Sequence, residues 1–335
     1  MTAKVSSAKL SAPAASNAAD RTVYNRLVLR SMDPTRRQLL AGIASAGASR
    51  AAAQVRPGPK PRTTPCVCLY SQLLIKVPYD ELGELLRTLG VDGCDLSVQP
   101  GGHVAPENAG LHLMRAVEAI TGVGLDVPVL TTAYTSLADP TIRTVAGVAG
   151  EMGVPLFRAG HWKYPGTGEV EQRLVEVQRD IGGLGALARA AGIAVAIHNS
   201  AGDNVGAAVW DIHMLIRGMD AAAVGYDFDI GYATAASGAD GWMVLFRLVR
   251  PRLKMVAVRD FIWSKGPTGW KLTQVPLGEG MVDWPRFFGL LAQSRFTGPI
   301  SVQMEYQPKD ELTAIRRDID FVKKQVAAAY GGHGG

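Results

Sequence analysis

The chain has 335 residues, of which 47% are hydrophobic, so it can bury the core of one large α/β domain or of two ordinary ones. Its net charge of +5 comes from the N-terminal part: residues 1–62 hold 11 basic and two acidic residues, whereas residues 63–335 hold 24 basic and 28 acidic residues. A nucleic-acid-binding surface needs basic residues on the folded body, so this distribution excludes a nucleic-acid partner.

Residues 1–62 are predicted to be a disordered N-terminal export leader and linker. In "DPTRRQLLAGIASAGASRAAAQ", Arg36 and Arg37 precede a short apolar run at residues 39–48 and then small residues. This order resembles a twin-arginine signal, so we expect a periplasmic or secreted protein; a plain disordered tail is the alternative. Met32 is a second candidate for the true start. The apolar run is too short to span a bilayer, and no other stretch of the sequence approaches a membrane span.

After residue 63, short apolar runs alternate with longer amphipathic segments. The first pair is "CVCLYS" (66–71) and "YDELGELLRTLG" (79–90), whose leucines recur at helical spacing. Seven further apolar runs follow, at residues 91–98, 127–134, 154–160, 193–199, 223–231, 253–261 and 298–306. Their amphipathic partners lie at residues 109–124, 139–153, 169–191, 206–219, 238–250, 283–294 and 309–330.

Continuous apolar runs are typical of strands that are buried on both faces of a parallel sheet. Helix-length segments between them indicate right-handed strand–helix–strand units. Eight such units over residues 63–330 predict one α/β domain, a single (β/α)8 TIM barrel. A doubly wound open sheet is the alternative, and it is disfavoured because no G-x-G-x-x-G follows the first strand.

A barrel places its functional side chains at the C-terminal ends of the strands and in the loops that follow them. His198 ends the fifth predicted strand, Asp229 ends the sixth, and Glu305 ends the eighth. Two carboxylates and an imidazole can hold a divalent ion, which would polarise a sugar hydroxyl or carbonyl. We therefore predict catalytic and metal-binding roles for these three residues, with Glu305 as the general base.

Other polar residues at the same rim are predicted to bind the substrate. They are His103, Glu107, Arg158, His161, Lys163, Asn199, Arg259, Asp260 and Gln303. Asp227 shares the inward face of its strand with Asp229, because strand side chains alternate. Simpler roles are open as well: His198 as a donor to a loop carbonyl, and Asp229 as the cap of the next turn.

Seven motifs occur in order along residues 66–306: "PGGHVAPE", "RAGHWKY", "NSAGDNVGAAVWD", "FDIGYA", "RDFIW", "PLGEGMVD" and "MEY". Together they resemble the xylose isomerase-like TIM-barrel superfamily, and most closely its exported sugar phosphate isomerase/epimerase-like branch. The resemblance implies a divalent metal ion (Mn, Mg or Zn), held by a Glu, an Asp, a His and a Glu on strands five to eight.

The ligand positions of this superfamily are kept only in part. His198 occupies the position of the Glu ligand on strand five, and Asp229 matches the Asp ligand on strand six. Ala257 occupies the position of the His ligand on strand seven. The strand-eight Glu falls at Gln303 or at Glu305. Two histidines and a lysine of the nearer branch are replaced here, by Ser200, Tyr232 and Arg259. Two interpretations follow: His198 replaces a lost ligand, or the site no longer holds a metal.

These observations predict an exported sugar isomerase/epimerase-like enzyme that removes a proton next to a carbonyl of a carbohydrate or polyol, with or without a divalent metal. A small-molecule carbohydrate is the expected partner. A keto-glycoside lyase or hydrolase on the same barrel is an alternative, and a non-catalytic sugar-binding barrel that has lost its metal is another. An AP endonuclease is disfavoured, because it needs a histidine-rich zinc cluster and a basic face.

Overall fold

Eight parallel strands form a closed barrel in the computed structural model, which describes residues 62–166 and 168–331. Around the barrel they follow the order β1 to β7 and then β10, which pairs with β1. Their bounds are Cys66–Tyr70 (β1), Gly93–Val98 (β2), Asp126–Thr132 (β3), Leu156–Arg158 (β4), Ala194–His198 (β5), Val224–Asp229 (β6), Leu253–Val258 (β7) and Pro299–Val302 (β10). The predicted α/β barrel is confirmed. Apart from Arg62, the predicted leader lies outside the described residues, and export stays a prediction.

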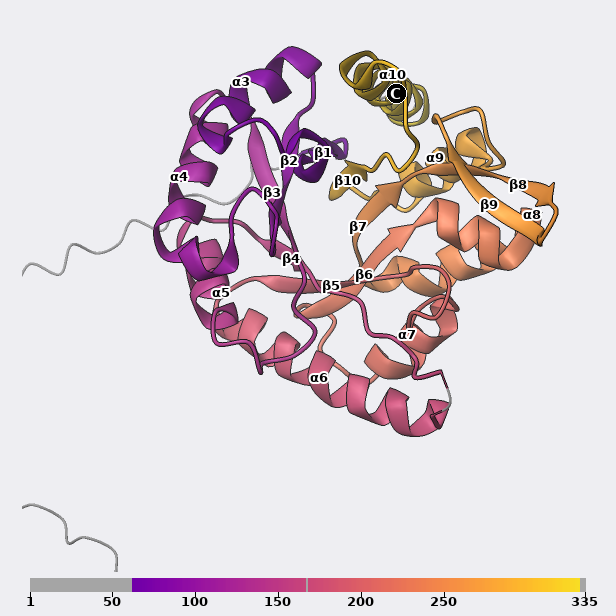
Figure 1. Ribbon diagram of the computed structural model, residues 1–335, viewed down its shortest axis with the longest axis horizontal. Helices are drawn as coiled ribbons and strands as arrows, with labels where there is room; N and C mark the ends of the chain where they lie inside the picture. The colour runs from indigo at the N-terminus through magenta and orange to yellow at the C-terminus, as the bar shows by residue number, and fades with distance from the viewer. Residues whose placement is uncertain (1–61, 167, 332–335) are drawn as a thin grey trace, which may run out of the picture. The chain divides into compact units, whose positions relative to one another are not determined.

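An α-helix follows each barrel strand, and the helices surround the strands on the outside (Figure 1). Their bounds are Tyr79–Leu89 (α3), Ala109–Gly122 (α4), Ile142–Glu151 (α5), Val170–Ala190 (α6), Val209–Ile216 (α7), Ile230–Val249 (α8), Trp284–Gln293 (α9) and Glu311–Tyr330 (α10). Within the part of the chain that the structure describes, none of these helices is long and apolar enough to cross a membrane.

Helix α3 illustrates how the sequence pattern builds this outer layer. Leu82, Leu86 and Leu89 recur at helical spacing, and all three are buried against the strands and the next helix. The helix ends at Gly90, whose φ of 83° lies in the left-handed region that glycine adopts without strain. The period of the leucines therefore fixes which side of the helix faces the barrel.

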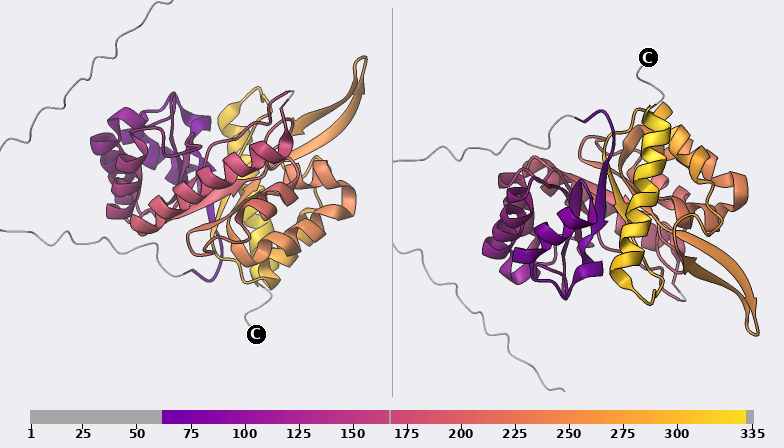
Figure 2. Two further views of the ribbon diagram at one scale, coloured as in Figure 1. Left: turned by 90° about the horizontal axis from the view of Figure 1, so that it is seen from below. Right: turned by 90° about the horizontal axis from the view of Figure 1, so that it is seen from above.

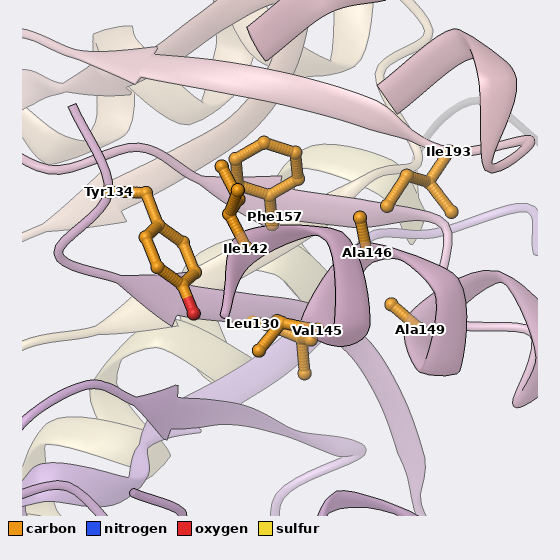
Figure 3. A pocket seen from close by; sticks show the side chains of 8 residues that line it. All are labelled: Leu130, Tyr134, Ile142, Val145, Ala146, Ala149, Phe157 and Ile193. Atoms are coloured by element: carbon orange, nitrogen blue, oxygen red, sulfur yellow. The ribbon is translucent and has the colours of Figure 1, made fainter. Parts of the chain in front are cut away.

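The contact between helices and strands is apolar. Figure 3 shows one part of it, where Ile142 and Val145 of helix α5 lie near Leu130 of β3 and Phe157 of β4. All residues that line this region are aliphatic or aromatic. Because alternate strand residues point to opposite sides, Thr131 and Arg158, the chain neighbours of Leu130 and Phe157, face the barrel axis.

Inside the barrel, an apolar layer lies next to a polar one. A small buried cluster, separate from the core between strands and helices, consists of Val129, Leu156, Ala196 and Met255. Two residues further along β3, β4 and β5, the inward positions hold Thr131, Arg158 and His198. Side chains on one face of a strand recur every second residue, so the polar layer lies toward the C-terminal ends of the strands.

A hairpin interrupts the path from β7 to helix α9. Its strands, β8 (Asp260–Gly266) and β9 (Gly269–Val275), pair with each other and stay outside the barrel sheet. The hairpin projects from the body of the barrel (Figure 2). The sequence pattern does not predict it, because its outer residues are mostly exposed and lack a buried face of their own.

The carboxylate of Asp260 holds the base of the hairpin together. Its five donors lie at 2.8–3.2 Å, and they are the backbone N–H groups of Phe261, Gly278, Gly280 and Val282 and the indole N–H of Trp284. At Gly280, an added Cβ would lie 2.1 Å from Asp260 Oδ1, so a larger residue would push the carboxylate away. A carboxylate offers about four acceptor sites, so Asp260 is fully used by the chain itself.

We expect Asp260→Asn to lower the free energy of unfolding by about 2–4 kcal/mol, because the amide turns its own N–H donors toward other donors. Urea denaturation followed by circular dichroism measures the change. Asp240→Asn is the matched control: Asp240 is exposed and lies 3.6 Å from Arg286, so a change below about 0.5 kcal/mol is expected. A loss for Asp260→Asn as small as that of the control would contradict the role given to Asp260.

Candidate active site

Polar side chains from the ends of five strands converge over the barrel axis. His198 of β5 is aligned in register with Asp227 of β6, and Asp229 of β6 is aligned with Ala257 of β7. Arg259 comes directly after β7, Gln303 comes directly after β10, and Glu305 follows two residues further along. With Arg158 at the end of β4, the barrel thus brings together residues that are up to 147 positions apart in the chain.

The guanidinium of Arg259 lies at the centre of this arrangement, and the side chain is 3% exposed. Its Nε donates to Asp229 Oδ2 at 2.5 Å, its Nη1 donates to the Tyr232 hydroxyl at 3.0 Å and to Glu305 Oε1, and its Nη2 donates to Gln303 Oε1. It also lies 4.3 Å from the centre of the Tyr232 ring. Although burial opposes the charge, Asp229 and Glu305 raise the pKa of Arg259 above its ordinary value. This centre therefore contains a permanent cation.

Asp229 is held from several sides. Its carboxylate accepts a hydrogen bond from the backbone N–H of Tyr232 at 2.8 Å, in the first turn of helix α8. The amide of Asn199 binds the backbone of Asp229 twice, with Nδ2 donating to the carbonyl at 3.0 Å and Oδ1 accepting from the N–H at 2.7 Å. Asp229 therefore caps helix α8 and holds Arg259 at the same time.

Four buried side chains beside this cluster carry polar atoms that have no hydrogen-bond partner among the described residues. These atoms are Nε and Nη1 of Arg158, both ring nitrogens of His198, both carboxylate oxygens of Asp227, and Nε2 of Gln303. His198 Nε2 lies 3.4 Å from Asp229 Oδ2 and 3.9 Å from Asp227 Oδ2, and Arg158 Nη1 lies 3.8 Å from Asp227 Oδ2. Buried polar groups are nearly always hydrogen-bonded, so these atoms are suited to bind a polar ligand or ordered water.

Burial controls the protonation of these groups. It raises the pKa of Asp227 to about 7, although the positive charge of Arg158 acts in the opposite direction. Burial and the charge of Arg158 lower the pKa of His198 well below its ordinary value. The ring of His161 meets that of His198 edge-on, 5.3 Å between centroids, and the pKa of His161 is lowered to about 4 by desolvation and by Arg158. Both imidazoles are therefore neutral at pH 7.

The structure brings eight of the residues predicted from the sequence to this centre. They are His198, Asp229 and Glu305 together with Arg158, His161, Asn199, Arg259 and Gln303.

Four predicted residues lie outside it. Lys163 is exposed and pairs with Asp203 at 3.1 Å. The His103 ring contacts two backbone carbonyls in the segment after β1, each at 3.2 Å. Glu107 is exposed in a short 3-10 helix, and Asp260 holds the base of the hairpin. The substrate-binding roles of these four residues stay predictions.

Some residues of the centre are absent from the set predicted to form the site. The Tyr232 hydroxyl donates to Glu305 Oε2 at 3.2 Å, and Gln274 of β9 donates to the same oxygen at 3.4 Å. Asp227 is completely buried, as is Asp95 of β2, which accepts hydrogen bonds from two hydroxyl groups at 2.6 Å. The alternation of aspartates along β6 is a sequence signal for Asp227. Nothing in the sequence brings Gln274 to Glu305, because the hairpin is not predicted.

A divalent ion held by His198, Asp229 and Glu305 does not fit this arrangement. Arg259 already bridges the two carboxylates, and its positive charge would repel a second cation placed between them. Ala257, at the position of the strand-seven histidine, has no ligand atom. Across residues 62–166 and 168–331, no group of three or more His, Cys, Asp or Glu side chains is arranged to hold a metal ion. The ligand positions are thus taken by a side-chain cation.

Solved structures of the same architecture share the fold at low sequence identity. A xylose isomerase-like TIM barrel protein from Mycobacterium smegmatis, in complex with magnesium, has a TM-score of 0.61 and 15% identity, and covers 80% of this chain and 97% of its own. L-ribulose 3-epimerase has a TM-score of 0.62 and 12% identity, with 80% and 96% coverage. The 3-keto-D-glucoside 4-epimerase from E. coli has a TM-score of 0.62 and 14% identity, with 78% and 99% coverage.

Among curated proteins, none matches the chain. The model of one protein family does match, over residues 83–325, which include the ends of β4 to β10 and therefore the whole centre around Arg259. The chain belongs to the xylose isomerase-like TIM barrel family.

Proposed function

We propose that the protein is a sugar isomerase- or epimerase-like enzyme that removes a proton from the carbon next to a carbonyl of a small carbohydrate. The observation that carries this proposal is an accessible carboxylate, Glu305, beside seven buried polar atoms that lack a partner. Such a site can bind the oxygen atoms of a substrate and move a proton next to them. The epimerases among the structural neighbours support this class of chemistry for the fold.

Glu305 is suited to be the base. Its side chain is 50% exposed, whereas Asp95, Asp227 and Asp229 are completely buried. Arg259 donates to one of its oxygens and Tyr232 to the other, which fixes the direction of the carboxylate. When Glu305 accepts a proton, its attraction to Arg259 weakens, and the guanidinium is left to attract the negative charge that develops on the substrate.

The buried groups are suited to bind the substrate oxygens. Arg158 and Gln303 have free N–H donors, and the protonated carboxyl group of Asp227 is a donor as well. These donors stabilise the oxyanion that forms when the proton leaves. His198 is neutral and has both ring nitrogens free, so it can accept a hydrogen bond from one substrate hydroxyl and donate to another. The exposed residue His161 packs its ring edge-on against that of His198, at the entrance to these groups.

Hydrogen exchange in deuterium oxide tests this proposal. We expect the enzyme to introduce deuterium next to the carbonyl of at least one of D-allulose, D-tagatose, L-ribulose and methyl 3-keto-D-glucoside, as measured by NMR. Glu305→Gln removes the base and should slow the exchange by about 10²–10⁴-fold. Glu151→Gln, exposed at the end of helix α5, is the control and should keep the wild-type rate. A folded wild-type protein that exchanges none of the four sugars would contradict the proposal.

The protonation of Asp227 predicts a pH dependence. The group donates to the substrate only in its acid form, and its pKa is about 7, so kcat/KM should fall as the pH rises through 7. Asp227→Asn keeps an N–H donor at every pH, and this fall should disappear from its profile. Asp227→Ala has no donor and should be slow over the whole range. An unchanged fall above pH 7 in Asp227→Asn would show that another group titrates.

A further inference from the structure

The Arg259 cluster has the composition of a cation site. Asp229 and Glu305 approach the guanidinium from two sides, and the amide oxygen of Gln303 approaches it from a third. Carboxylate and amide oxygens are also the ligands that Mg²⁺ and Mn²⁺ prefer. In this chain the same oxygens all accept hydrogen bonds from one side chain.

Most of the donors of Arg259 are used within this cluster. A guanidinium has five N–H groups. The Nε group binds Asp229, the two Nη1 groups bind Tyr232 and Glu305, and one Nη2 group binds Gln303. One Nη2 group therefore remains. The unpartnered Nε2 of Gln303 belongs to the amide beside it, so two donors are left together for an oxygen atom of a ligand.

We propose that the Arg259 guanidinium replaces a divalent ion in this enzyme. It holds Asp229 and Glu305 together, and its remaining N–H group, with that of Gln303, binds the carbonyl oxygen of the substrate. The protein binds no divalent ion between these carboxylates, and its reaction proceeds without one. The contact with the substrate and the metal-free reaction rest on the proposed function, whereas the claim that no divalent ion binds between the carboxylates does not depend on any activity.

This replacement changes how the site can act on a carbonyl group. The guanidinium carries one positive charge spread over three nitrogens, so it polarises a carbonyl less strongly than a divalent ion does. The free donors of Arg158, His198 and Asp227 compensate, because each can add a hydrogen bond to a substrate oxygen. The unpartnered donors are thus the counterpart of the missing metal ligand, because they supply polarisation that a divalent ion would otherwise provide.

Binding of Mn²⁺ to the full-length protein, followed by electron paramagnetic resonance after treatment with EDTA, tests the claim about the cation. The wild type should bind no Mn²⁺ at about millimolar concentration. Arg259→Ala removes the guanidinium and leaves the oxygens, so Mn²⁺ should bind at least about tenfold more tightly. Arg259→Lys keeps a cation and should behave like the wild type. Arg252→Ala is the control, because Arg252 binds two backbone carbonyls away from this centre and its loss should create no site.

Two results would overturn the proposal. One is tight Mn²⁺ binding by the wild type that Asp229→Asn abolishes. The other is a folded Arg259→Ala, checked by circular dichroism, that binds Mn²⁺ no better than the wild type. If Arg259→Ala does not fold, the wild type and Arg259→Lys still decide. Tight Mn²⁺ binding by either that Asp229→Asn abolishes overturns the proposal, and its absence in both supports it. If the protein neither binds Mn²⁺ nor exchanges hydrogen, the proposed function is contradicted, while the claim that no divalent ion binds is supported.

A second observation, independent of Arg259, concerns one face of the hairpin. Directly paired residues of the two strands are Phe261 and Gln274, Trp263 and Leu272, and Lys265 and Trp270. Paired residues share a face with those two positions along, so all six side chains lie on the same side. This face begins at Gln274, which donates to Glu305, and ends at the exposed rings of Trp263 and Trp270. An aromatic surface therefore leads away from the predicted base.

We infer that this face binds the second ring of an elongated substrate, a disaccharide or other glycoside, whose reacting ring lies at Glu305. Aromatic faces attract the polarised C–H groups of sugar rings. Gln274 and Trp270 are four residues apart, about 13 Å along the strand, which exceeds the length of one sugar ring. The inference rests on the proposed function, because the surface is continuous with the base assigned there.

Calorimetric titration with maltose, cellobiose, trehalose and glucose tests this inference. At least one disaccharide should bind more tightly than glucose, and Trp270→Ala should weaken that binding about tenfold without changing the affinity for glucose. Trp210→Ala, on the exposed side of helix α7, is the matched control and should have no effect.

Three outcomes would contradict the inference. These are unchanged disaccharide affinity in Trp270→Ala, no disaccharide binding by the wild type, and a wild type that light scattering finds dimeric but that becomes monomeric in Trp270→Ala, which would show that a second copy covers the face. Hydrogen exchange on the four sugars named above separates these outcomes from failure of the proposed function.

Discussion

A charge that is buried in a protein has to be paired, and the centre of this barrel is built around that requirement. Arg259 is almost completely buried, and its partners are Asp229, Tyr232, Gln303 and Glu305. These partners come from the end of β6, the first turn of α8 and the segment after β10. One guanidinium therefore ties the last third of the barrel together, and its loss would leave two carboxylates facing each other.

The layered interior explains why Arg158, His198 and Asp227 keep polar atoms that are available to a ligand. Below them, the apolar cluster that includes Leu156 and Ala196 offers no hydrogen-bond partners. Beside them, Arg259 has already taken the charges of Asp229 and Glu305. His198 and the other unpartnered groups of its layer are buried, and burial favours the neutral form of a group that can gain or lose a proton. A substrate rich in hydroxyl and carbonyl oxygens matches this mixture of donors and acceptors.

The fold could be predicted because the eightfold alternation of apolar runs and amphipathic segments is a repeated signal that single errors do not erase. The strand ends then identify many residues of the centre, since a barrel gathers its C-terminal ends at one rim. Which charges pair cannot be predicted in the same way. Arg259 and Asp260 are neighbours in the sequence, yet one faces the axis and the other lies under a loop. The predicted metal ligands illustrate the same limit, because a third residue decides whether two carboxylates are free.

The anchoring of Asp260 fixes the base of the hairpin, where Gln274 contacts Glu305, and leaves only the outer part of the hairpin separate from the site. The carboxylate joins the start of β8 to the loop that follows β9, so both ends of the hairpin are closed at one point next to Arg259. The length of the two strands beyond Gln274 does not affect the positions of the barrel residues. A chain of this architecture could acquire a longer, shorter or differently decorated hairpin by insertion or deletion without shifting the guanidinium. The outer hairpin, which would set the range of substrates, could then evolve independently of Arg259 and Glu305, which would carry out the proton transfer.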